Sequence, residues 1–130
     1  MTRPEVRELL ERARTELAAG RSLAEGRFAA QAVMHAYYAA FFAAEAALLA
    51  LGETRSKHSG VISAFGQLVV KTGSVDAETG SKLRKLFELR NTATYDAAKV
   101  EADLALSAIA DAERFAAAVE AWLHRRQGSA

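Results

Sequence analysis

The chain has 130 residues, enough for one domain that buries roughly two-thirds of the surface that its unfolded form exposes. Its 17 lysines and arginines nearly balance 16 aspartates and glutamates, which argues against non-specific coating of nucleic acid or anionic membrane but allows a local basic cleft. The absence of cysteine excludes disulfide scaffolds and thiolate metal sites, and makes the cytoplasm the expected compartment.

Abundant alanine, a single proline and few runs that alternate apolar with polar residues predict an all-α protein. The first helix is expected to start at a capping box formed by Thr2 and Glu5, and its apolar stripe ends near Gly20. The second helix is expected at about 23–51, with Gly52 as its stop.

The second helix carries two adjacent aromatic stripes. One bundle core usually uses a single stripe, so this helix is expected to be covered on two sides. It is either the central helix of the bundle or part core and part subunit interface. Polar residues interrupt its apolar run, which favours a soluble helix over a membrane span. The stripes are Met34, Tyr37, Phe41 and Leu48, and, about 100° around the axis, His35, Tyr38, Phe42 and Leu49.

Three more helices complete an antiparallel up-and-down bundle of four to five helices. Ser56 or Ser59 is expected to cap the third helix, which ends near Gly73. Asp76 is expected to cap the fourth, which ends around Tyr95. The fifth is expected at about 100–124, and residues 127–130 are expected to fray.

Arg90 falls on the apolar stripe of the fourth helix. A guanidinium keeps its charge and is costly to bury unpaired, so this side chain needs an anionic partner or a wet, shared surface. The structural alternative is an ion pair with Glu88, Asp96 or an acid of the fifth helix.

Three segments, in order, resemble small helical proteins of the HEPN family. They are the aromatic stretch at 37–49, the Lys57-His58-Ser59-Gly60 turn that opens the third helix, and residues 86–91 followed by Ala93 and Tyr95. The resemblance covers nearly the whole chain and implies a single HEPN-like domain over residues 1–130.

The family motif is an arginine, a polar residue, a short spacer and a histidine. Arg90 matches the arginine and Asn91 the polar residue, whereas Tyr95 stands in place of the histidine. In the small standalone subgroup that the chain most resembles, the motif reads arginine, two residues, alanine, aspartate and tyrosine. Thr94 replaces that aspartate.

The resemblance implies a homodimer in which the motif residues of two subunits meet at a cleft. Active members are metal-independent ribonucleases, often toxins encoded beside a minimal nucleotidyltransferase antitoxin, and neither a metal nor a cofactor is expected. A phenol with a pKa of about 10 is a poor base at pH 7, and lost acid–base assistance costs about 10²- to 10⁴-fold. Tyr95 in the histidine's place therefore favours binding of RNA or nucleotide over turnover. Nucleotide transfer to Tyr95 is a further hypothesis.

The candidate site residues follow from the motif and from the positive charge of the fourth helix. The motif, or catalytic, positions are Arg90, Asn91 and Tyr95. The expected RNA- or nucleotide-binding residues are Arg90, Lys82, Arg84, Lys85 and His58, and the expected dimer interface contains Tyr38, Phe42, Arg90 and Tyr95.

The leading interpretation is a cytoplasmic, homodimeric module of a prokaryotic two-gene system, with a small nucleotidyltransferase and RNA or nucleotide as partners. The first alternative is an active ribonuclease toxin in which His58 or His35 supplies the missing base. The second is a purely structural dimerisation bundle. The scattered histidines lack the i, i+4 spacing of a metal site.

Overall fold

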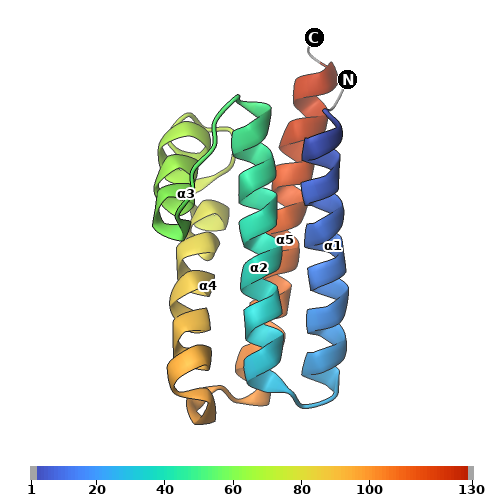
Figure 1. Ribbon diagram of the computed structural model, residues 1–130, viewed down its shortest axis with the longest axis vertical. Helices are drawn as coiled ribbons and strands as arrows, with labels where there is room; N and C mark the ends of the chain where they lie inside the picture. The colour runs from blue at the N-terminus through green and yellow to red at the C-terminus, as the bar shows by residue number, and fades with distance from the viewer. Residues whose placement is uncertain (1–2, 129–130) are drawn as a thin grey trace.

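The computed structural model describes residues 3–128, which form an antiparallel up-and-down bundle of four long helices with a short helical arm at one side (Figure 1). The predicted all-α bundle is confirmed, and the described residues contain no strand. The arm lies between α2 and α4 in the chain. The long helices are α1 (Pro4–Glu25), α2 (Ala29–Ala50), α4 (Ala77–Tyr95) and α5 (Ala102–Gly128); the arm is α3 (His58–Phe65) followed by the π-helix η1 (Gly66–Val70), and a 3-10 turn, η2 (Ala97–Lys99), precedes α5.

α2 is the central helix, since it contacts α1, α3, α4 and α5. Its many alanines let the neighbouring helices approach closely, and Val33, Tyr37 and Leu48 fill the space between them. α2 is also the one described helix long and apolar enough to span a membrane, but 67% of the relevant window is buried inside the bundle. This burial is compatible with the core helix of a soluble protein.

The boundary between α1 and α2 differs from the prediction. α1 continues past Gly20 to Glu25, and α2 begins only at Ala29, after a turn in which Arg27 has a φ of 69°. Gly20 is buried where α1 packs on α2 and α5, and a Cβ there would lie 2.5 Å from Cδ1 of Ile109, 3.3 Å from Cβ of His35 and 3.4 Å from the carbonyl oxygen of Ala32. This glycine therefore permits close packing rather than ending the helix. Thr2, the predicted cap, lies outside the described residues.

The later boundaries are closer to expectation. Gly52, with a φ of 78°, follows the end of α2 as predicted. The Asp76 carboxylate caps α4 by accepting a hydrogen bond from the Thr79 amide at 3.0 Å. Neither predicted serine caps α3, because Lys57 occupies that position. Helix α5 extends beyond its predicted end into the segment expected to fray, and residues 129–130 lie outside the described part.

Candidate functional site

Arg90 is half-buried between α4 and α2, and no carboxylate in the described part of the chain forms a salt bridge with it. Its Nη1 donates to Oδ1 of Asn91 and its Nη2 to the hydroxyl of Tyr38, both at 3.2 Å. The guanidinium carbon lies 5.7 and 5.8 Å from the ring centres of Tyr37 and Tyr38. These neutral contacts orient the cation and leave its charge uncompensated.

His58, the first residue of α3, lies against the same pair of tyrosines. Its Nδ1 is 2.6 Å from the hydroxyl of Tyr37, and its ring stacks on Phe41 with centroids 4.3 Å apart. Burial, and then the positive charge of Arg90, lower the pKa of His58 below its ordinary value. We call Tyr37, Tyr38, His58, Arg90 and Asn91 the Arg90–His58 cluster.

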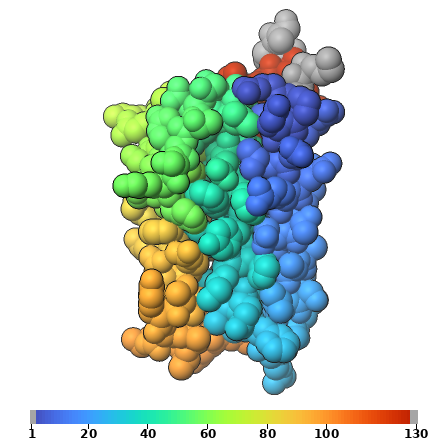
Figure 2. All heavy atoms as spheres, viewed as in Figure 1, coloured from blue at the N-terminus to red at the C-terminus, as the bar shows by residue number. Residues whose placement is uncertain are grey.

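The second aromatic stripe of α2 continues from this cluster along the surface. Tyr38 and Phe42 are half-buried, and the Arg12 guanidinium of α1 lies 4.1 Å from the centre of the Phe42 ring. In Figure 2 the atoms of α2 form a strip between α1 on the blue side and α3 and α4 on the other. This half-buried strip carries Tyr38 and Phe42, two of the four residues expected at the subunit interface.

The α1 side of the strip is acidic. Glu5, Glu8, Glu11 and Glu16 line a surface hollow of about 590 Å³ together with Arg12. An anion is therefore disfavoured on the α1 side, and the positive potential of Arg90 lies toward α4.

Lys82 and Lys85 do not join Arg90, because both face α5. Their Nζ atoms donate to the two carboxylate oxygens of Asp111 at 3.2 and 3.1 Å. Asp111 is the one buried charged residue of the described core. Burial alone would raise the pKa of Asp111, but hydrogen bonds from Lys85 and Lys82 outweigh it and hold the pKa below its ordinary value. The two lysines thus anchor α4 to α5.

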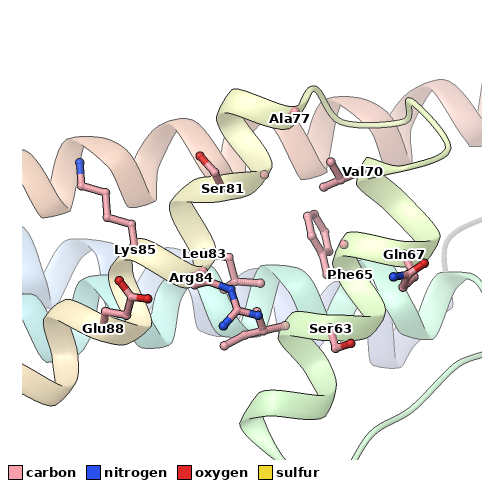
Figure 3. Close-up of a pocket in the computed structure, with 13 residues that line it drawn as sticks. Ser63, Phe65, Gln67, Val70, Ala77, Ser81, Leu83, Arg84, Lys85 and Glu88 are labelled. Carbon is pink, nitrogen blue, oxygen red and sulfur yellow. The ribbon is translucent and has the colours of Figure 1, made fainter.

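Arg84 points in a third direction, into a groove of about 610 Å³ between α3, η1 and α4. Figure 3 shows Phe65, Val70 and Leu83 around the apolar part of this groove and Arg84 reaching across it from α4. Lys85 also lines this groove while its ammonium group pairs with Asp111, so the basic residues of α4 do not all point toward Arg90.

Tyr95 and His35 also lie apart from the cluster. Tyr95 is 85% exposed at the end of α4, and no described side chain bonds to its hydroxyl. His35 pairs through Nδ1 with the carboxylate of Glu16 on α1. Of the two histidines considered as substitutes for the missing base, only His58 is adjacent to the tyrosines that contact Arg90.

Two residues of the site were not predicted from the sequence. Tyr37 was predicted only as a member of one aromatic stripe and of the family-like aromatic stretch, yet its hydroxyl binds His58. Arg12 was not considered, although it covers Phe42. The adjacent Tyr37-Tyr38 pair was a usable signal, because neighbouring helical residues point about 100° apart and so can serve both core and surface.

The comparisons with known proteins agree with this architecture. The HEPN domain family model matches residues 6–122. A UPF0332 protein of Thermotoga maritima is 42% identical over 90 residues, or 68% of each chain. A Methanocaldococcus jannaschii protein named "Putative toxin MJ0605" is 37% identical over 113 residues, which cover 87% of this chain and 84% of that protein.

The crystal structure of TT1696 from Thermus thermophilus shares the fold. It matches with a TM-score of 0.78 at 23% sequence identity, over 94% of this chain and 99% of that one. The family match spans almost the whole bundle and includes every residue of the Arg90–His58 cluster. The chain belongs to the HEPN domain family.

Proposed function

We propose that this protein binds the phosphate group of RNA or of a nucleotide at the Arg90–His58 cluster, as the HEPN component of a toxin–antitoxin-like module. The observation that carries the proposal is the Arg90 guanidinium, which is half-buried, oriented by neutral partners and free of any salt bridge to a described carboxylate. A cation held in this way is prepared to pair with an external anion.

The choice of a phosphate follows from the geometry of the donors. Two of the five guanidinium N–H groups are used by Asn91 and Tyr38, which leaves others for a ligand. Phosphate oxygens suit an arginine fork, and the adjacent aromatic rings offer contact area to a ribose or a base. The Lys82 and Lys85 ammonium groups are engaged by Asp111, so Arg90 is the principal cation of the proposed site.

The module is proposed to act as a homodimer through the half-buried strip of α2, so that two copies of Arg90 flank one cleft. This arrangement would cover Tyr38 and Phe42 and would add a second guanidinium to the same phosphate. Tyr95, exposed in the single chain, would lie at the rim of such a cleft. A minimal nucleotidyltransferase is the proposed protein partner, because toxins of the HEPN family, to which this chain belongs, are often encoded beside one.

Binding rather than cleavage is the proposed activity. Tyr95 stands at the motif position of the histidine, and a phenol is a poor base near neutral pH. Its ring is exposed rather than packed into the Arg90–His58 cluster. A labelled RNA is therefore expected to be bound and to remain intact.

The test measures fluorescence anisotropy of a labelled single-stranded RNA, with ATP as a competitor to distinguish a polymer from a free nucleotide. Arg90→Ala is expected to weaken binding by about 10- to 100-fold, the value of a hydrogen bond to a charged group. Arg90→Lys is expected to restore only part of the affinity, because an ammonium lacks the fork. Arg84→Ala is the matched control, since it removes the same charge from the same helix outside the cluster.

Equal affinity of wild type and folded Arg90→Ala would refute the proposal. Sedimentation analysis tests the homodimer, and co-purification after co-expression with a minimal nucleotidyltransferase tests the partner. Mass spectrometry of Tyr95 after co-expression with that enzyme tests its modification.

A further inference from the structure

The imidazole of His58 is held in one orientation, although the residue lies at the very start of a helix. Its ring stacks on Phe41 at an interplanar angle of 16°, and Tyr38 approaches edge-on with centroids 6.1 Å apart. The hydroxyl of Tyr37 binds Nδ1 at 2.6 Å. These contacts fix both the plane of the ring and the nitrogen that faces the core.

The direction of the Tyr37–His58 hydrogen bond follows from burial. Tyr37 is fully buried, and Nδ1 of His58 is the one acceptor that the described residues offer to its O–H. An O–H that pointed elsewhere would be a buried donor without an acceptor, which is energetically costly. Burial also raises the pKa of Tyr37, so the phenol keeps its proton. Nδ1 is therefore the acceptor.

The proton of neutral His58 must then be on Nε2, because a neutral imidazole has one donor and one acceptor nitrogen. No described group bonds to Nε2. Among the described residues, every side-chain nitrogen that is shielded from solvent in a buried or half-buried residue has a hydrogen-bond partner, so the unpaired Nε2 must be accessible to solvent. Nε2–H thus reaches the surface next to the two tyrosines that contact Arg90.

We propose that His58 is a fixed, neutral hydrogen-bond donor, whose Nε2–H binds a phosphate oxygen beside Arg90, and that Tyr37 is the positioning residue that sets its tautomer. This inference rests on the proposed function and deepens it. It adds a second hydrogen-bond donor for the phosphate and explains why the Arg90–His58 cluster would bind RNA without cleaving it. The exposed nitrogen already carries its proton and cannot accept one. The other nitrogen is occupied by Tyr37, so His58 does not replace the missing base.

The tautomer is tested on protein labelled with ¹⁵N-histidine, by long-range ¹H–¹⁵N correlation at neutral pH. Wild-type His58 is expected to show a protonated Nε2 and an unprotonated Nδ1. Tyr37→Phe keeps the ring in the core but removes the hydroxyl, and is expected to give a mixture of tautomers. His35 and His124 serve as internal references, and His58→Gln assigns the signal. A protonated Nδ1 in wild-type neutral His58 would overturn the proposal.

Binding is tested with the same labelled RNA and with ATP. His58→Phe keeps an aromatic ring but lacks the donor, and is expected to weaken affinity by about three- to tenfold. His58→Gln places an amide N–H near the position of Nε2 and is expected to bind more tightly than His58→Phe. If Arg90→Ala loses affinity while folded His58→Phe does not, the role of His58 is refuted and the proposed function stands. If wild type binds neither probe, both are refuted.

Discussion

Replacing Asp111 by alanine should destabilise the bundle more than the loss of any other single acidic side chain. Its carboxylate is 8% exposed and lies between Lys82, which is 16% exposed, and Lys85, which is 63% exposed. Arg114 adds a weaker contact at 3.7 Å. The substitution would leave Lys82 largely buried and without an anionic partner.

The expected loss of folding free energy follows from how exposed each cationic partner of Asp111 is. Removing one member of a buried ion pair costs about 3–5 kcal/mol. Lys82 retains some access to water, so the lower figure of about 3 kcal/mol applies. Exposed Lys85 and Arg114 together add less than about 1 kcal/mol. For a domain of this size, the total corresponds to a decrease in Tm of roughly 10 °C.

The assay is thermal and urea denaturation followed by circular dichroism at pH 7. Glu113→Ala is the matched control, because Glu113 lies on the same helix and pairs with Arg21 on the surface, where both side chains are more than a third exposed. Its loss should cost less than about 1 kcal/mol. The double variant Asp111→Leu with Lys82→Met, which removes the buried carboxylate together with the half-buried ammonium group that pairs with it, should recover most of the lost stability.

The stabilising effect of Asp111 should also depend on pH. Its pKa is lowered in the folded state, so the stability that it contributes is present above the unfolded pKa and is lost as the pH falls through the folded pKa. A cost for Asp111→Ala no greater than that for Glu113→Ala would refute the structural role of this carboxylate. If Lys82→Ala bound RNA more weakly at unchanged stability, Lys82 would instead be a binding residue, as the sequence predicted.

Two other substitutions test packing and burial. Gly20→Ala should destabilise the fold by about 1 kcal/mol, because its Cβ would displace Cδ1 of Ile109 and press on Cβ of His35 and the carbonyl oxygen of Ala32. Gly66→Ala, which meets open space, should instead stabilise the fold by up to about 1 kcal/mol. Equal unfolding midpoints for the two variants would contradict the close packing around Gly20. Burial raises the pKa of Glu45 despite the nearby charge of Arg12. The stability of the fold should therefore fall as the pH rises from the unfolded pKa of this carboxyl through its higher folded pKa. Glu45→Gln should therefore have a higher Tm than wild type at neutral pH, and the difference in Tm should shrink in acid. A difference in Tm that does not change with pH would contradict the raised pKa of Glu45.

The fold was largely predictable because helix formation is local. Three- and four-residue spacing identified the helices, Asp76 begins one of them as expected, and Gly52 follows the end of another. Small errors occurred at helix ends, such as the cap of α3, and the main error occurred where a residue's role depends on another helix. In the sequence, Gly20 looks like the residue that ends the first helix. Only the position of Ile109 in the folded structure shows that this glycine is a packing residue.

The candidate site was predictable only in part. The motif identified Arg90 and Asn91, which the structure brings together with His58 through the two tyrosines. The basic residues of α4 were equivalent in the sequence because they share one helix and one sign of charge. Their partners lie on different elements, so Lys82 and Lys85 pair with α5, whereas Arg84 lies in the groove beside α3.

The sequence by itself determined a cysteine-free helical bundle, the family motif and the substitution of tyrosine for its histidine, since all of these are properties of residue type and local spacing. Only the tertiary structure decided that Arg90 is without a salt bridge among the described residues, that Asp111 engages the two lysines, and that the Tyr37 hydroxyl faces Nδ1 of His58. The physical reason is that the charge and protonation of a side chain depend on burial and on partners distant in the chain, and local periodicity carries no information about either.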